Sequence, residues 1–138
     1  MSTNRILKFS IVFFISVLIF HFCVLFGIID FKIVWGGRLE SNEQMYVFES
    51  ISIIINSFCL YLLLEQLQVC KQRLSLRFHK FMMMSLSVLF AVNTVGNLAS
   101  LNSLETKIFT PLTFIFSICF FYLGKQIKNE SKKIDIKV

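Results

Sequence analysis

The stretch Trp35-Gly-Gly-Arg-Leu-Glu-Ser-Asn-Glu-Gln-Met-Tyr-Val-Phe-Glu49 joins two apolar segments and indicates how the chain folds. Its Gly pair predicts a tight turn, because glycine reaches backbone conformations with positive φ that a Cβ disfavours. Ser41-x-x-Gln44 is typical of a capping box, in which side chains satisfy free N–H groups at the start of a helix. We therefore expect a helix to begin after Ser41 and to carry the acid Glu49 two turns into an apolar segment.

Apolar residues make up 56% of the 138 residues, above the roughly 45–50% that is usual for soluble domains. The runs 9–29 and 81–104 contain no charged residue, and each is long enough for a helix to cross a bilayer. Segments 45–67 and 108–124 are less clean candidates, since the first carries two acids and the second is short. The sequence thus predicts an all-α fold, an integral membrane four-helix bundle forming a single transmembrane domain over residues 1–138. The expected helices cover about 6–29, 42–69, 79–101 and 104–126.

The net charge of +6 does not indicate nucleic-acid binding, because the basic residues lie at the ends of the apolar segments. Eleven of the 14 Lys and Arg residues lie before the first segment, between the second and third, or after the fourth. By the positive-inside rule, both termini are predicted to be cytoplasmic, and 127–138 to be a basic cytoplasmic tail that is frayed and solvated. This face is expected to attract anionic lipids of the bilayer.

The first apolar segment is too long for a signal peptide and lacks a small-x-small cleavage site, so we expect it to be a retained helix. The four cysteines form no C-x-x-C pair, and none falls in a predicted outer loop. Structural disulfides and thiol-oxidoreductase chemistry are therefore not expected. No cluster of metal-ligating residues is apparent either, and neither a metal nor a cofactor is predicted.

A polar stripe follows the second predicted helix. Glu49, Ser52, Asn56 and Cys59 recur at helical spacing among Ile, Phe and Leu residues. An ionisable side chain facing lipid costs about 2.5–3.5 kcal/mol at the centre of a helix, and less near its end, where Glu49 lies. The stripe should therefore face protein or water. A helix-helix hydrogen bond, or Glu49 reaching the headgroups, is the structural alternative to a functional acid.

Other polar residues lie near the cytoplasmic end of this helix and in the loop that follows. Glu65 marks the helix end, and Lys71 or Arg73 is expected to pair with it. His79 is expected to be solvated in the basic loop. The inner half of the bundle is otherwise predicted to be mostly apolar.

The third predicted helix places Asn93, Asn97 and Ser100 on one face. Gly96 and Ser100 have the small-xxx-small spacing of closely packed membrane helices, so this face predicts either a helix contact or a polar site. The small residues of the first helix likewise predict a helix contact, and His21 points away from them.

The start of the fourth helix is open. Asn102-x-x-Glu105 is a second candidate capping box, and a helix that starts there contains Pro111, which should kink it. If the helix starts at Thr110 instead, Pro111 is a favourable first residue. The expected inward stripe comprises Thr110, Thr113, Ser117 and Gly124.

Placed at a common depth, polar residues from several segments fall in the outer half of the bilayer and predict a ligand pocket. The candidate ligand-binding residues are His21, Glu49, Asn56, Asn93, Asn97 and Thr110. Trp35, an expected interfacial anchor, and Arg38 lie in the loop expected to roof the pocket. Arg38 is also expected to form surface pairs with Glu40 and Glu43.

Three classes of function remain open. The first is binding, or helping to move, a small or lipid-like ligand in the outer pocket. The second is a structural or accessory subunit, in which the polar stripes contact another membrane protein or a second copy of the chain. The third is an intramembrane enzyme that uses Glu49 and His21 as acid and base. The sequence supports an enzyme least, because it offers no paired carboxylates, metal cluster or activated nucleophile.

Four short segments carry a resemblance. They are Val34-Trp-Gly-Gly-Arg38, Gly96-Asn-Leu-Ala-Ser100, Ser103-Leu-Glu105 and Phe109-Thr-Pro-Leu112. These segments resemble a group of small uncharacterised bacterial four-helix integral membrane proteins, which implies the bacterial cytoplasmic (inner) membrane and no particular activity. Emopamil-binding-like proteins are similar only in having four membrane helices and membrane acids, and no shared motif transfers their sites.

Overall fold

Four long helices follow one another along the chain in the computed structural model, which describes residues 3–100, 103 and 105–135. The long helices are α1 (Thr3–Leu25), α2 (Asn42–Gln66), α3 (Leu76–Leu98) and α4 (Thr110–Asp135). Two short 3-10 segments, η1 (Phe31–Ile33) and η2 (Trp35–Gly37), lie between α1 and α2, and a π-helical segment, η3 (Glu105–Phe109), precedes α4. The described residues contain no strand. Four helices are long and apolar enough to cross a membrane, which confirms the predicted all-α class.

Local hydrogen bonds set where α1 and α2 end. Gly27 has a φ of 71°, and the N–H groups of Ile28 and Ile29 both donate to the carbonyl of Cys23. This turn ends α1 at Leu25, four residues before the predicted end. At the end of α2, Gln68 takes a φ of 61° and its N–H donates to the carbonyl of Glu65. No glycine marks this turn, which is why the sequence predicted a longer helix.

Serine side chains cap the starts of α2 and α3. The Ser41 hydroxyl accepts a hydrogen bond from the Gln44 N–H, as the capping box predicted. The Gln44 side chain accepts a hydrogen bond from the backbone N–H of Glu40. In a standard capping box it would accept from the N–H of the capping residue itself, Ser41. The Ser75 hydroxyl accepts from the Phe78 N–H in the same way, so α3 begins at Leu76, three residues earlier than predicted.

Pro111 is the second residue of α4, a helix that begins at Thr110 directly after the π-helical segment η3. A proline inside an α-helix lacks an N–H donor, and its ring clashes with the carbonyl four residues earlier. The wider π turn changes the hydrogen-bond spacing at this position. The Thr113 hydroxyl also donates to the carbonyls of Phe109 and Thr110. The proposed capping box at Asn102 lies outside the described residues.

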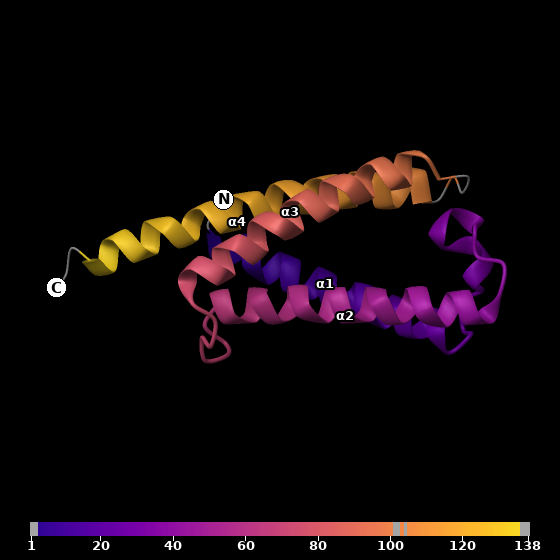
Figure 1. Ribbon diagram of the computed structural model, residues 1–138, viewed down its shortest axis with the longest axis horizontal. Coiled ribbons are helices and arrows are strands. Elements are labelled where there is room, and N and C mark those ends of the chain that lie inside the picture. The colour runs from indigo at the N-terminus through magenta and orange to yellow at the C-terminus, as the bar shows by residue number, and fades with distance from the viewer. Residues whose placement is uncertain (1–2, 101–102, 104, 136–138) are drawn as a thin grey trace.

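The four helices form two hairpins that diverge toward one end. α1 packs mainly along α2, and α3 mainly along α4, whereas the two hairpins contact each other sparsely. Figure 1 shows the hairpins close together near the α2–α3 connection and apart near the α1–α2 loop. α1 begins and α4 ends on the side of the α2–α3 connection.

The largest apolar cluster fills the narrow part of the bundle. Its aromatic centre joins rings of three helices. The ring centroid of Phe14 lies 5.9 Å from that of Phe90 and 5.2 Å from that of Phe116, and the centroids of Phe90 and Phe120 are 5.4 Å apart. Ile127 is buried in the same cluster, which explains why α4 continues beyond the predicted end at residue 126. The remaining buried members are Leu7, Cys59, Leu62, Leu63, Met83, Leu86 and Leu123.

α3 and α4 approach each other closely because their interface uses small residues. The Ser87 hydroxyl donates to the carbonyl of Ser117 at 2.8 Å, and the Ser117 hydroxyl donates to the carbonyl of Ser87 at 2.9 Å. Near the far end of the pair, a Cβ added at Gly124 would lie 3.1 Å from Met84 Sδ and 3.2 Å from Met83 Cβ. The predicted inward positions of Ser117 and Gly124 are therefore used for helix packing.

We expect Gly124→Leu to lower the free energy of unfolding by about 1–3 kcal/mol, the usual cost of overpacking a filled interface. Met83 is fully buried and cannot move away freely. Thermal unfolding in detergent micelles measures the effect. Gly96→Leu is the matched control, since a Cβ there meets nothing within 4 Å and leucine is the better helix former. Equal loss of stability in the two variants would contradict this account of the interface.

Candidate functional site

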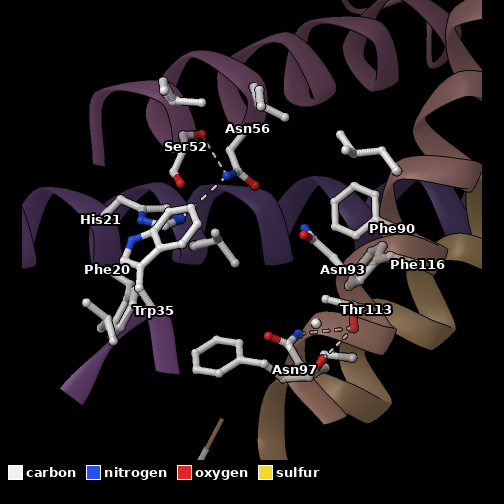
Figure 2. A pocket seen from close by; sticks show the side chains of 18 of the residues that line it. Phe20, His21, Trp35, Ser52, Asn56, Phe90, Asn93, Asn97, Thr113 and Phe116 are labelled. Carbon is white, nitrogen blue, oxygen red and sulfur yellow. Dashed lines mark hydrogen bonds between the residues drawn. The ribbon is translucent and has the colours of Figure 1, made fainter. Parts of the chain in front are cut away.

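A cavity of about 370 Å³ lies between the diverging hairpins (Figure 2). Its volume falls near the lower limit of the roughly 300–1,000 Å³ that is usual for ligand pockets. All four long helices and the α1–α2 loop contribute to its wall. The polar lining residues are His21, Trp35, Arg38, Glu49, Ser52, Asn56, Asn93, Asn97, Ser100 and Thr113. The cavity therefore combines polar groups from elements that are distant in the sequence.

Most of the candidate residues lie together in this wall, and one does not. His21, Glu49, Asn56, Asn93 and Asn97 line the cavity, as do Trp35 and Arg38 of the roofing loop. Thr110 is not part of the lining, and its buried hydroxyl oxygen has no hydrogen-bond partner among the described residues. Thr113, one turn further along α4, lines the cavity in its place.

Glu49 is completely buried and joins α2 to both α1 and the loop. Its Oε2 lies 2.7 Å from His21 Nδ1, and its Oε1 accepts a 2.9 Å hydrogen bond from Trp35 Nε1. An ionised carboxylate only accepts hydrogen bonds, so an ionised Glu49 requires the proton of a neutral His21 on Nδ1. The other ring nitrogen, Nε2, is then an acceptor. This arrangement orients the imidazole and leaves neither carboxylate oxygen without a donor.

Asn56 lies next to the free nitrogen of His21. Its Nδ2 donates to the carbonyl of Ser52 at 2.7 Å and lies 3.5 Å from His21 Nε2. The first contact is a strong hydrogen bond, whereas the second is at the outer limit of hydrogen-bond length. Asn56 therefore holds its amide beside the imidazole without fully using the acceptor capacity of Nε2.

The opposite wall of the cavity is formed by α3 and α4. The Thr94 hydroxyl donates to Thr113 Oγ1 at 3.0 Å, and Asn97 Nδ2 lies 3.4 Å from the same oxygen. Asn93 makes no side-chain hydrogen bond within the part of the chain that the structure describes, and Figure 2 shows its amide pointing into the cavity. Gly96 also faces this space, so its small size creates room here and does not serve a helix contact.

Arg38 links the loop to the end of α3. Its Nη2 donates to the carbonyl of Ala99 at 2.8 Å, where a cation is favourable beside the C-terminal carbonyls of a helix. The predicted pairs with Glu40 and Glu43 are not formed, because no described carboxylate lies within 4.0 Å of the guanidinium. Within the described chain, the guanidinium thus lies at the cavity without a carboxylate to match its charge.

Trp35 adopts an unusual backbone conformation over the cavity. Its φ is 55°, which is rare for a bulky residue and requires support from its surroundings. The hydrogen bond to Glu49 gives part of this support. The indole ring also packs against Phe48, with 4.9 Å between the two ring centroids. The loop beneath is anchored by a small apolar cluster of Val24, Val34, Leu39 and Met45.

A second buried network at the other end of α2 was not predicted. Glu65 Oε1 accepts hydrogen bonds from the Tyr61 hydroxyl and from the Arg73 backbone N–H, and Oε2 lies 3.2 Å from His79 Nδ1. His79 is only 2% exposed, so the expectation of a solvated histidine is wrong. Arg73 donates to Glu65 with its backbone N–H, and no ion pair with its side chain is formed among the described residues. A carboxylate is therefore buried toward each end of α2, Glu49 at one and Glu65 at the other.

No protein-family model, curated protein or solved structure matches the chain. Within residues 3–100, 103 and 105–135, no group of three or more His, Cys, Asp and Glu side chains is placed to hold a metal ion. The chemical character of the site therefore follows from its own side chains: an oriented imidazole, a buried carboxylate, one guanidinium and several neutral amides and hydroxyls.

Proposed function

We propose that this chain is an integral protein of the bacterial cytoplasmic (inner) membrane with both termini on the cytoplasmic side. Four helices of membrane-spanning length and composition support insertion. Each helix also leaves large apolar side chains exposed, including Val12, Ile54, Val88 and Phe114. The basic residues near the α2–α3 connection support the orientation by the positive-inside rule. The cavity then lies toward the outer leaflet.

Within this orientation, the proposed function is to bind, or help to move, a small or lipid-like ligand in the cavity. The observation that carries the proposal is the cavity wall itself, which mixes apolar rings with an amide that has no partner in the described chain, Asn93. Asn93 is exposed toward the cavity, so a ligand bound there can supply a hydrogen-bond partner for its amide. The diverging hairpins give the cavity its width without a break in the helices.

The two other classes of function have weaker support. A structural or accessory subunit would use its polar stripes against another protein, but Asn56, Asn93 and Asn97 line the internal cavity. An intramembrane enzyme is favoured by the orientation of His21 on Glu49, which is that of a general base. Among the described residues, the lining contains no Cys, Lys or second carboxylate beside this pair, so they do not assemble a complete catalytic set.

Filling the cavity tests the proposal. We expect Gly96→Phe to lower the affinity for a brominated single-chain amphiphile by about tenfold or more, because the ring occupies space that the ligand needs. Bromine quenches indole fluorescence on contact, and Trp35, the only tryptophan of the sequence, lines the cavity. Saturable quenching in detergent micelles therefore measures occupancy.

Val88→Phe is the matched control, since it adds the same ring to an exposed position of the same helix, outside the cavity lining. It should bind the probe like the unmodified protein. If Gly96→Phe and Val88→Phe bind the probe equally well, the cavity is not the ligand site.

A further inference from the structure

We propose that the ligand of this cavity is a single-chain amphiphile with an anionic head, either a carboxylate or a phosphate, which is bound by Arg38. The inference rests on the proposed ligand-binding function and adds the charge class of the ligand. It follows from three features of the cavity: an unmatched guanidinium at the loop, an acid whose oxygens are already occupied, and an apolar wall that extends along α1.

Arg38 is the one Lys or Arg among the described residues of the cavity lining. Only its Nη2 is used, in the hydrogen bond to the Ala99 carbonyl, and the described chain places no carboxylate within ion-pair distance. An arginine has five N–H donors in a planar fork that matches a carboxylate or a phosphate. The hydrogen bond to Ala99 holds the side chain in place, so binding an anion requires little further ordering.

The carboxylate of Glu49 is occupied by partners other than Arg38. Its side chain is fully buried. Its Oε1 accepts a hydrogen bond from Trp35 Nε1, and its Oε2 contacts His21 Nδ1. The groups that face the cavity beside Arg38 are neutral donors and acceptors, namely the amides of Asn93 and Asn97 and the imidazole of His21. An anionic head therefore meets a cation and polar neutral groups before it reaches the buried acid.

The apolar part of the cavity gives the chain of the amphiphile a path. Phe13, Val17 and His21 of α1 line the cavity at successive turns, a distance of roughly 12 Å at 1.5 Å per residue. Phe90 and Phe116 face this path from the other hairpin. The volume of about 370 Å³ is near the lower limit for ligand pockets, which favours one chain over two.

Three brominated probes of equal chain length test the charge class: dibromostearate, the corresponding alcohol and the corresponding phosphate monoester. Quenching of Trp35 is measured in mildly alkaline buffer, which keeps the carboxylate ionised. We expect dibromostearate or the phosphate monoester to bind about tenfold more tightly than the alcohol. The tighter of the two anions identifies the head group.

Arg38→Gln should abolish this preference by lowering the affinity for the anions far more than the affinity for the alcohol, because glutamine keeps a polar amide and removes the positive charge. Arg38→Lys should retain a preference for the anions, since it keeps the charge. Lys32→Gln is the matched control: it removes one positive charge from the same loop at a residue that does not line the cavity, and the preference should persist.

The outcomes separate this inference from the proposed function. Equal affinity for alcohol and anions in the unmodified protein, or equal effects of Arg38→Gln and Lys32→Gln, would overturn the anionic head and leave the ligand cavity standing. If none of the three probes quenches Trp35 saturably, both proposals fail.

Discussion

Replacement of Glu65 by alanine is expected to lower the free energy of unfolding by about 3–5 kcal/mol, because the change leaves three donors without their acceptor. Glu65 is 2% exposed and serves the Tyr61 hydroxyl, the Arg73 N–H and His79, of which His79 is buried. The network also ties the α2–α3 connection to the end of α2.

Thermal and denaturant unfolding in detergent micelles measure this loss. Arg73→Ala is the informative control, since Arg73 contributes its backbone N–H and the substitution preserves that group. We expect Arg73→Ala to change the free energy of unfolding by less than about 0.5 kcal/mol, as is usual for a side chain outside the core. If Arg73→Ala destabilises the protein as much as Glu65→Ala does, Glu65 is held by a salt bridge to the Arg73 side chain and our assignment of the network is incorrect.

Glu49→Ala is expected to cost about 2–4 kcal/mol of unfolding free energy, since two donors lose their acceptor. The effect is smaller than at Glu65, where three donors lose their acceptor. The substitution also removes the hydrogen bond between the indole and α2, so probe binding in the cavity should weaken. Glu49→Gln should be milder, because its amide oxygen still accepts one of the two hydrogen bonds.

A double-mutant cycle between Glu49→Ala and His21→Ala isolates the contact between these two residues. We expect a coupling free energy of at least about 0.5 kcal/mol, the lower limit for residues in one hydrogen-bond network. Unfolding of the two single variants and the double variant in the same micelles measures it. Strictly additive effects would show that the 2.7 Å contact between His21 and Glu49 does not stabilise the fold.

Much of the fold can be predicted from local features of the sequence. The lengths of the apolar runs predict four helices, and a serine at Ser41 marks the start of α2. The helical spacing of Glu49, Ser52 and Asn56 correctly predicts that they share an internal face. These properties depend on a helix turn and its immediate neighbours, so they do not require knowledge of any other helix.

Errors arose where a residue's partner lies on another element. His79 was expected in solvent because the basic loop begins nearby, yet the rotation of α3 against α2 places it on Glu65. Gly96 has the spacing of a helix contact, but the divergence of the hairpins leaves open space beside it. Arg38 has acids close in sequence and instead donates to Ala99 at the end of α3.

The sequence by itself determined that this chain forms four apolar helices, which side chains share a helix face, and where a capped helix begins. The tilt and rotation of the two hairpins determined that those faces enclose a cavity and that Glu49 contacts His21 and Trp35. They also determined that Arg38 has no carboxylate partner in the part of the chain that the structure describes. The physical reason is that helical periodicity defines directions around one axis, whereas a contact depends on the relative placement of two axes, which is set by packing across the whole interface.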